Sequence, residues 1–362
     1  MQTEPTEEMP TDYPLAQPHV RQMQGYVPGE QPQAGKFIKL NTNENPFPPA
    51  ENVVRAIKDA AESHLNLYPD PTCLAFRRVA AEVLKVEPDW IICGNGSDDI
   101  LTILTRTFVG AGQALRMANP SYTLYRTLAQ IQNAETDVVD YEGDWSLPAQ
   151  FYAPPSKVKL IYLANPNSPS GTLIAKREIE RHLGELTCPL VVDEAYGDFA
   201  VENCVELVNK SDKVIVTRSL SKSYSLAGLR FGFAVAQPHV IAQLLKIKDS
   251  YNCDRLSIAG ATAALSNQAW LSETLQKIKQ TRMRLEQTLS DLGFNVTPSQ
   301  ANFVWCQHPR KASRTIYQEL KEQRILVRYM SYDGWGDGIR ITVGSDSQID
   351  AMLAILKSIL GI

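Results

Sequence analysis

The chain has 362 residues, of which 44% are hydrophobic and 21% are charged, and its formal net charge is −4. The length suits one large domain with a smaller one, and the composition is typical of globular proteins. The acidic balance argues against a nucleic-acid-binding surface, and the sequence lacks the run of about 18 apolar residues that crosses a bilayer. We therefore expect neither a nucleic-acid partner nor a membrane segment.

The six cysteines and five histidines are scattered, without the paired spacing of metal sites. We expect no bound metal, and reduced thiols in a cytoplasmic protein. The acidic start, which also contains prolines, predicts a disordered tail over residues 1–20 rather than a signal peptide. Residues 21–45 are expected to form an arm that packs with the C-terminal part of the chain.

Within residues 46–254, the stretch from about 52 to 247 alternates short β-branched runs with longer stretches of helical period. This rhythm predicts the α/β fold class, with a large domain built on a mostly parallel sheet flanked by helices. The expected helices are 53–62, 74–84, 98–108 and 240–248. The expected strands are 90–93, 159–164, 190–192, 214–217 and 231–236.

Residues 255–362 mix helices and strands differently and predict a smaller α+β domain. A long helix is expected over residues 274–293, with an apolar stripe of Leu275, Ile278, Met283, Leu285 and Leu289. Further helices at 315–323 and 348–360, with strands at 325–330 and 339–344, complete this part.

A glycine-containing turn, Gly94-Asn-Gly-Ser-Asp-Asp99, joins the first expected strand to a helix. Its glycines would let the backbone approach an anion, and the N–H groups of Ser97 and Asp98 at the helix start could bind a phosphate. An ordinary strand-turn-helix connection explains the segment almost as well. The pattern is neither GxGxxG nor a Walker motif, so a dinucleotide or nucleoside-triphosphate site is not supported.

Two proline-containing turns lie further along the chain, Asn119-Pro-Ser-Tyr122 and Asn165-Pro-Asn-Ser-Pro-Ser-Gly171. Tyr122 offers an aromatic ring that could stack on a planar ligand. An amide of the second turn could reach an oxygen of the same ligand.

The strand over 190–192 ends in Asp193-Glu-Ala-Tyr196. A carboxylate at the end of an apolar strand is costly unless it is paired, and a protonated pyridine nitrogen would be a suitable partner. Tyr196 could then hydrogen-bond a phenolic oxygen on that ring. The alternative is that Asp193 caps the following turn.

The strand over 214–217 leads into a segment with Ser219, Ser221, Lys222 and Arg230. Two hydroxyls and a guanidinium could converge on a phosphate, while the Lys222 amine reaches an aldehyde of the same molecule. A solvated surface lysine is the alternative for Lys222 alone. Pyridine, phenolic oxygen, aldehyde and phosphate are together the groups of pyridoxal 5′-phosphate.

In this order the segments resemble the fold-type-I pyridoxal-phosphate-dependent aminotransferases, over nearly the whole chain after the tail. Within that group they are similar to the histidinol-phosphate aminotransferases. This second resemblance depends on Gly25-Tyr-Val-Pro-Gly29, Lys39-Leu-Asn-Thr-Asn-Glu-Asn-Pro46, Tyr68-Pro-Asp-Pro71, the 94–99 turn and Ile339-Arg-Ile-Thr-Val-Gly344.

The resemblance implies that Lys222 is the catalytic Schiff-base lysine, which also moves the proton of the reaction. It implies a homodimer in which Tyr68 reaches the cofactor phosphate of the partner subunit. It implies that Arg340 binds the substrate's carboxylate or phosphate, assisted by Arg328 and Tyr26. The implied cofactor-binding residues, besides Tyr68, are Ser97, Asp98, Tyr122, Asn167, Asp193, Tyr196, Ser219, Ser221 and Arg230.

One position departs from the family pattern, which has Asn directly before Pro-Thr-Gly. Here Ser168 occupies that position and Asn167 precedes it. We assign the contact with the phenolic oxygen to Asn167, with Ser168 as the alternative.

The implied reaction converts histidinol phosphate and 2-oxoglutarate into imidazole acetol phosphate and glutamate, a step of histidine biosynthesis. An aminotransferase for aromatic or other amino acids would share the cofactor residues, and a threonine-phosphate decarboxylase would share Lys222 and the arginine pair. A catalytically silent cofactor-binding protein is a further alternative. The presence of Lys222, Asp193, Tyr196 and Arg230 argues against it.

Overall fold

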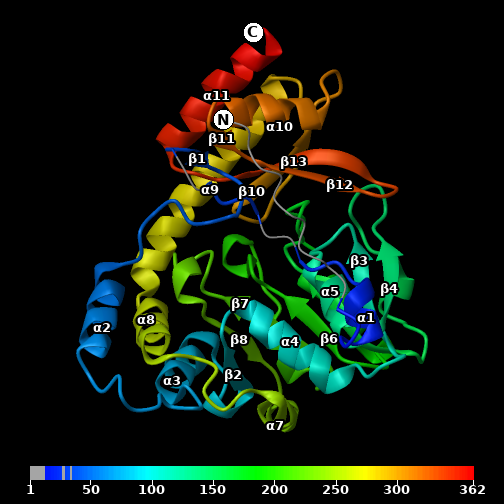
Figure 1. The fold of residues 1–362 in the computed structure, drawn as a ribbon, viewed down its shortest axis with the longest axis vertical. Coiled ribbons are helices and arrows are strands. Elements are labelled where there is room, and N and C mark those ends of the chain that lie inside the picture. The colour runs from blue at the N-terminus through cyan, green and yellow to red at the C-terminus, as the bar shows by residue number, and fades with distance from the viewer. Residues whose placement is uncertain (1–12, 27–28, 33–34) are drawn as a thin grey trace.

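A seven-stranded sheet forms the centre of the larger part of the computed structural model, which describes residues 13–26, 29–32 and 35–362 (Figure 1). In this large sheet β8 runs antiparallel to β2 and β7, while the pairings among β7, β6, β5, β3 and β4 are parallel. The prediction of an α/β fold with a mostly parallel sheet is therefore confirmed. In spatial order the strands are β2 (Ile91–Gly94), β8 (Gly232–Val235), β7 (Val214–Ser219), β6 (Leu190–Asp193), β5 (Val158–Ala164), β3 (Ala114–Asn119) and β4 (Glu135–Asp140).

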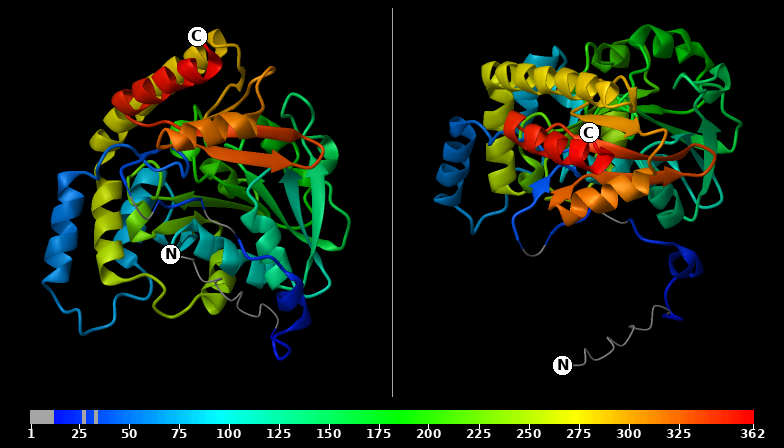
Figure 2. Two further views of the ribbon diagram at one scale, coloured as in Figure 1. Left: turned by 45° about the horizontal axis from the view of Figure 1, so that its top comes forward. Right: turned by 90° about the horizontal axis from the view of Figure 1, so that it is seen from above.

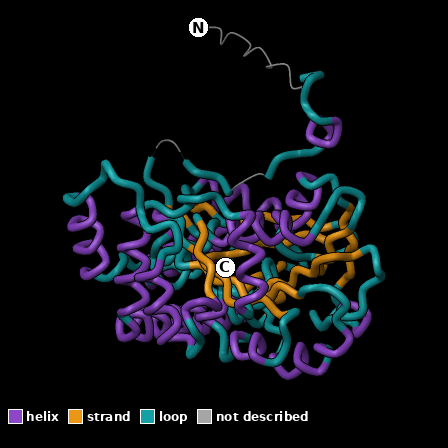
Figure 3. The backbone as a smooth tube through the Cα atoms, turned by 90° about the horizontal axis from the view of Figure 1, so that it is seen from below, coloured by secondary structure: helices purple, strands orange, loops and turns teal. Residues whose placement is uncertain are grey.

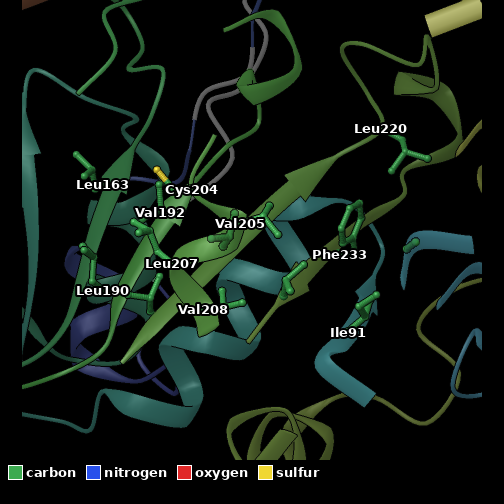
Figure 4. Packing of buried hydrophobic residues seen from close by; sticks show 14 of the residues in the cluster. Ile91, Leu163, Leu190, Val192, Cys204, Val205, Leu207, Val208, Leu220 and Phe233 are labelled. Atoms are coloured by element: carbon green, nitrogen blue, oxygen red, sulfur yellow. The ribbon is translucent and has the colours of Figure 1, made fainter. Parts of the chain in front are cut away.

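Helices cover both faces of the large sheet, so its central strands are buried and apolar on both sides. One face packs against α4 (Ser97–Phe108), α5 (Leu124–Ile131) and α7 (Pro238–Ile247). The other face packs against α3 (Leu74–Leu84), α6 (Lys176–Arg181) and α8 (Arg255–Ser266), with α2 (Glu51–Ala61) alongside α8. Figure 4 shows this second core, where Leu190 and Val192 lie beside Leu207 and Val208.

A second sheet of the described residues has the order β12-β13-β10-β9 and is antiparallel throughout. Its core is shared with the later part of α9 (Gln268–Asp291), with α10 (Ser313–Glu322) and with α11 (Asp346–Leu360). This small sheet lies above the large one in Figure 2. Its strands are β9 (Asn295–Thr297), β10 (Phe303–Gln307), β12 (Arg328–Tyr332) and β13 (Gly336–Thr342).

The described part of the N-terminal arm runs from the large part to the small one. Its short helix α1 (Pro18–Gln22) lies near α5, and its strand β1 (Ile38–Lys39) pairs in parallel with β11 (Ile325–Leu326). In Figure 3 the loops of the molecule are teal, and helices lie on both sides of the strands. Of the predicted tail, residues 1–12 lie outside the described residues, and α1 begins within the rest.

The structure differs from the sequence-based expectations in several details. The strands β3 and β4 and the helices α5, α6 and α8 were not among the expected elements. Met283 was placed in the apolar stripe of α9 but is 59% exposed, because it lies five residues, or about 140°, around the helix from Ile278. The expected domain boundary near residue 254 places helix α8 in the smaller domain, yet this helix packs in the core of the large sheet. The boundary itself stays a prediction. Among the described residues no helix is long and apolar enough to span a membrane.

Candidate active site

A cavity of about 260 Å³ lies at the carboxyl ends of the parallel strands, beneath the small sheet and the arm. Open α/β sheets bind their ligands at this edge. Most of the predicted site residues line this one cavity: Tyr26, Ser97, Asp98, Tyr122, Asp193, Tyr196, Ser219, Ser221, Lys222, Arg230, Arg328 and Arg340.

Lys222 lies in the turn that follows β7, and its side chain is half-buried. Its Nζ donates a hydrogen bond to the carbonyl oxygen of Thr42 in the arm, at 3.0 Å. Loss of water around the amine, followed by repulsion from Arg340, lowers the pKa of Lys222 to about 8. A substantial fraction of the amine is therefore neutral and nucleophilic near physiological pH.

Asp193 ends β6 at the floor of the cavity and is almost fully buried. Its carboxylate accepts a hydrogen bond from Tyr125 Oη at 2.6 Å and another from Thr217 Oγ1 at 2.9 Å. Burial raises the pKa of Asp193, although both hydrogen bonds oppose that shift. A cationic ring nitrogen beside this carboxylate would supply the missing countercharge.

The start of α4 forms the anion-binding end of the cavity. Gly96 precedes the helix with φ +86°, and a Cβ there would lie 2.7 Å from Arg230 Nη2. A Cβ on Gly232 would lie 2.4 Å from the backbone nitrogen of Ser97. Both glycines thus allow β8, Arg230 and the helix start to approach closely, and the N–H groups there favour an anion.

Arg230 connects the two sides of this anion-binding end. Its Nη1 lies 3.3 Å from Ser221 Oγ, and its Nη2 lies 3.2 Å from Asp98 Oδ2. Ser219 Oγ accepts a hydrogen bond from the backbone N–H of Ser221 at 3.2 Å. Two hydroxyls, a guanidinium and the start of α4 therefore line the same cavity.

Two tyrosines lie between these ends. Tyr196 Oη accepts a hydrogen bond from Asn43 Nδ2 at 2.8 Å. Tyr122 Oη donates to Asp98 Oδ1 at 3.2 Å, and its ring meets that of Tyr26 at 6.0 Å between centroids in an edge-on arrangement. Burial raises the pKa of both Tyr122 and Tyr196, so both hydroxyls are protonated and can donate hydrogen bonds.

Asn167 does not belong to the described residues that line the cavity, although the sequence-based assignment placed it there. Its side-chain nitrogen donates to the carbonyl of Pro120 and to Ser170 Oγ, while its oxygen accepts from Ser121. These bonds tie two turns together and use the amide fully. Ser168 lines the cavity instead, and its Oγ accepts from Arg340 Nη1 at 2.9 Å.

Tyr68 also lies away from the cavity of its own subunit. Its side chain is 78% exposed, and its ring stacks on that of Tyr251 with centroids 4.3 Å apart. Any contact of Tyr68 with a cofactor therefore requires a second subunit.

Arg328 and Arg340 are direct partners in the register of β12 and β13, so their side chains share one face of the small sheet. Arg340 Nη2 donates to the carbonyl oxygen of Asn41 at 3.1 Å. Like charges placed opposite each other on a sheet repel, and this pair is therefore suited to an anionic ligand in the cavity.

Sequence reasoning missed several residues of the site. The arm contributes Asn41, Thr42 and Asn43 to the cavity, and Tyr125 holds Asp193 from behind. The buried atoms Asn41 Oδ1, Thr42 Oγ1 and Arg340 Nε have no hydrogen-bond partner among the described residues. The sequence signals for these residues are the Asn-rich arm segment 39–46 and the position of Tyr125 three residues after Tyr122.

The cavity offers a group for each polar part of pyridoxal 5′-phosphate: a carboxylate for the pyridine nitrogen, an amine for the aldehyde and a cationic cradle for the phosphate. The chemistry of these donors thus fits the cofactor. No cluster of three His, Cys, Asp or Glu side chains in the described chain could hold a metal ion.

Comparison with known proteins agrees with this site. The family model for aminotransferase class I and II matches residues 35–356. The chain therefore belongs to the class I and II aminotransferases.

Its relatives include a histidinol-phosphate aminotransferase from Rhodopirellula baltica, 56% identical over 341 residues and 94% of each chain. Another from Synechocystis is 43% identical over 95% of this chain and 98% of the relative. A solved histidinol-phosphate aminotransferase from Sinorhizobium meliloti, in complex with pyridoxal-5′-phosphate, superposes with a TM-score of 0.89 at 27% identity, covering 97% of this chain and 98% of that one.

An L-threonine-O-3-phosphate decarboxylase from Porphyromonas gingivalis shares the fold, with a TM-score of 0.78 at 22% identity over 90% of this chain and 99% of that one. At that identity the likeness concerns the fold alone. The predictions of an aminotransferase that uses pyridoxal phosphate, and of the resemblance to the histidinol-phosphate aminotransferases, are confirmed.

Proposed function

We propose that the protein transfers the amino group between histidinol phosphate and 2-oxoglutarate, giving imidazole acetol phosphate and glutamate. The observation that carries this proposal is the arginine pair, Arg328 and Arg340, facing the same cavity as the Lys222 amine. One substrate brings a phosphate and the other brings carboxylates, so each needs cations at a distance from the reacting amine. The names of the relatives at 56% and 43% identity support the same substrates.

Pyridoxal 5′-phosphate, when bound, supplies an electron-withdrawing ring that stabilises negative charge at the substrate's Cα. Asp193 holds the ring nitrogen in its cationic form, and Tyr196 donates to the phenolic oxygen. Ser219, Ser221 and Arg230 hold the phosphate with the N–H groups of Ser97 and Asp98.

Lys222 would hold the cofactor's aldehyde carbon through Nζ, and the same amine would take and return the proton at the substrate's Cα. A lysine with a pKa of about 8 suits both directions of this transfer, because neither protonation state is strongly favoured near neutral pH. Tyr122 lines the cavity, and its ring would stack on that of the cofactor.

Arg340 binds the carboxylate of glutamate or 2-oxoglutarate, while Arg328 and Tyr26 bind the phosphate of the alternative substrate. Ser168 and the carbonyl of Asn41 fix the Arg340 guanidinium at 2.9 Å and 3.1 Å. Because Ser168 lines the cavity and Asn167 does not, we assign the contact with the phenolic oxygen to Ser168.

The exposed Tyr68 supports a homodimer in which it reaches the cofactor phosphate of the partner subunit. A cytoplasmic location follows from a biosynthetic role. The relatives' names support that role.

The test is to compare kcat/KM for histidinol phosphate and for phenylalanine, each with 2-oxoglutarate. We expect a preference of at least about 100-fold for histidinol phosphate, because loss of a charge-assisted phosphate contact costs about 1.5–3 kcal/mol per bond. Equal values would support a broader aminotransferase. Release of carbon dioxide from threonine phosphate, without amino transfer from glutamate, would support a decarboxylase.

A further inference from the structure

A buried cluster of charged side chains lies directly behind the cavity. Arg218 Nε lies 2.8 Å from Glu194 Oε2, and Arg218 Nη1 lies 2.6 Å from Asp198 Oδ1. The Arg218 and Glu194 side chains are 8% and 1% exposed, and Asp198 is 20% exposed. We call these three residues the Arg218 cluster. None of the three is among the residues that line the cavity.

Each part of the cluster is next in sequence, or nearly so, to a residue of the site. Glu194 follows Asp193 at the end of β6, and Arg218 precedes Ser219 in β7. Glu194 is held further by the backbone N–H of Cys204, which donates to Oε1 at 2.5 Å. The cluster therefore joins the ends of the two strands that carry the site.

The same cluster reaches the turn of the catalytic lysine. Ser223 Oγ donates to Asp198 Oδ2 at 2.5 Å. Asn45 Nδ2 in the arm lies 3.1 Å from the carbonyl oxygens of both Lys222 and Ser223. The turn at Lys222 and Ser223 is thus held both by the cluster and by the arm.

Stability alone does not account for such a cluster. Buried ion pairs pay a large desolvation cost, and apolar residues of similar volume often serve a fold equally well. In this cluster Arg218 Nε and Glu194 Oε2 form an ion pair without a hydrogen bond, whereas Asp198 accepts hydrogen bonds from both Arg218 and Ser223. Buried hydrogen bonds of this kind supply a fixed geometry. Here the geometry that they fix is that of the turn from which the Lys222 side chain enters the cavity.

We propose that Arg218, Asp198 and Ser223 are positioning residues that hold the turn of Lys222, so that Nζ stays aligned with the cofactor's aldehyde. Arg218 orients Asp198, and Asp198 holds Ser223 through its hydroxyl. Loss of any link lets the turn shift while the cavity lining stays intact. This inference rests on the role proposed for Lys222.

The test uses three single variants: Ser223→Ala, Arg218→Lys and the control Arg116→Lys. Arg116 is also a buried arginine of the large sheet, 2.6 Å from Asp137, but it does not line the cavity or contact the lysine turn. Cofactor-free protein is mixed with pyridoxal 5′-phosphate across a range of pH, and the rate of covalent capture is followed by visible absorption. Thermal unfolding of each variant is measured in parallel.

We expect Ser223→Ala and Arg218→Lys to lower the high-pH plateau of the capture rate roughly 10- to 100-fold, because misplacement by about an ångström has effects of this size. Arg116→Lys should lose comparable thermal stability and keep the plateau. Equal plateaus in Ser223→Ala and the unaltered protein would overturn the inference, and this variant answers the question even if Arg218→Lys does not fold. Failure of the unaltered protein to capture the cofactor would instead contradict the proposed function.

Discussion

The proposed cofactor half of the cavity is built on the ends of buried parallel strands, whereas the proposed substrate half comes from the small sheet and the arm. Asp193 and Ser219 end strands that pack on both faces, and their positions are fixed by the core of the large sheet. Arg328 and Arg340 come from β12 and β13 of the small sheet, and Tyr26 comes from the arm.

This difference separates two kinds of effect. Changes in the cofactor half should lower the rate for every amino donor to the same degree, because every substrate uses the same ring and the same lysine. Changes in the substrate half should distinguish one substrate from another, because only the substrates differ there.

The largest expected effect is that of Lys222→Ala. Removing the amine removes both the covalent hold on the cofactor and the proton transfer at Cα, so kcat should fall about 10⁴-fold or more for all substrates. Single-turnover rates with glutamate would measure this loss. Lys277→Ala, at an exposed lysine of α9, serves as the control. Turnover that persists in Lys222→Ala would remove this residue from its proposed role.

Asp193→Asn should follow, with a loss in kcat of about 10³-fold that is equal for glutamate and histidinol phosphate. The amide keeps the shape of the carboxylate and can still accept from Tyr125 or Thr217, but it cannot hold a ring nitrogen in its cationic form. Steady-state rates with both donors check this. A loss confined to one donor would contradict the assignment of Asp193 to the cofactor.

The cofactor half was also the part that could be predicted best from the sequence. Asp193, Lys222 and Ser97 each follow an apolar strand within a few residues, so a local pattern places them at the same edge of the sheet. The contacts of Asn43 and Tyr125 depend on how the arm and α5 pack against distant strands. No local pattern carries that information.

The same reasoning applies to the elements. The central strands β5, β6 and β7 each contain a buried apolar run, and the sequence indicated them within two residues at either end. The edge strand β4 has only half-buried and exposed positions and carries three acidic residues, Glu135, Asp137 and Asp140. Such a strand is held by its pairing with β3, and its amino-acid composition alone does not predict it.

In the substrate half, Arg328→Ala should raise KM for histidinol phosphate about 10- to 100-fold and leave KM for phenylalanine unchanged, because loss of one charge-assisted bond costs about 1.5–3 kcal/mol. Steady-state kinetics with both substrates measure the split. Arg314→Ala, at an exposed arginine outside the cavity lining, should change neither value. Equal changes for both substrates would assign Arg328 to the fold and not to phosphate binding.

The pH dependence of cofactor capture should show the lowered pKa of Lys222 directly. The protonated amine cannot attack an aldehyde, and the pKa of about 8 lies below the ordinary value of 10.5. The capture rate of cofactor-free protein should therefore rise about tenfold per pH unit below pH 8 and level off above it. Stopped-flow absorption would record the profile. A midpoint near 10 would mean that the amine is as well hydrated as a surface lysine.

The smallest expected effect concerns an aromatic contact between the small sheet and the large part, outside the cavity. Trp335, between β12 and β13, packs against Trp145 of the large part with ring centroids 4.8 Å apart. Trp335→Ala should lower the free energy of unfolding by about 1 kcal/mol or somewhat more, because it removes an aromatic pair together with its buried area. Denaturant unfolding measures this, and Trp335→Phe, which keeps a ring, should lose less. Because β12 carries Arg328, the KM for histidinol phosphate should rise slightly in Trp335→Ala, while kcat with glutamate stays the same. A fall in kcat for every substrate would show that the cofactor half also depends on this contact.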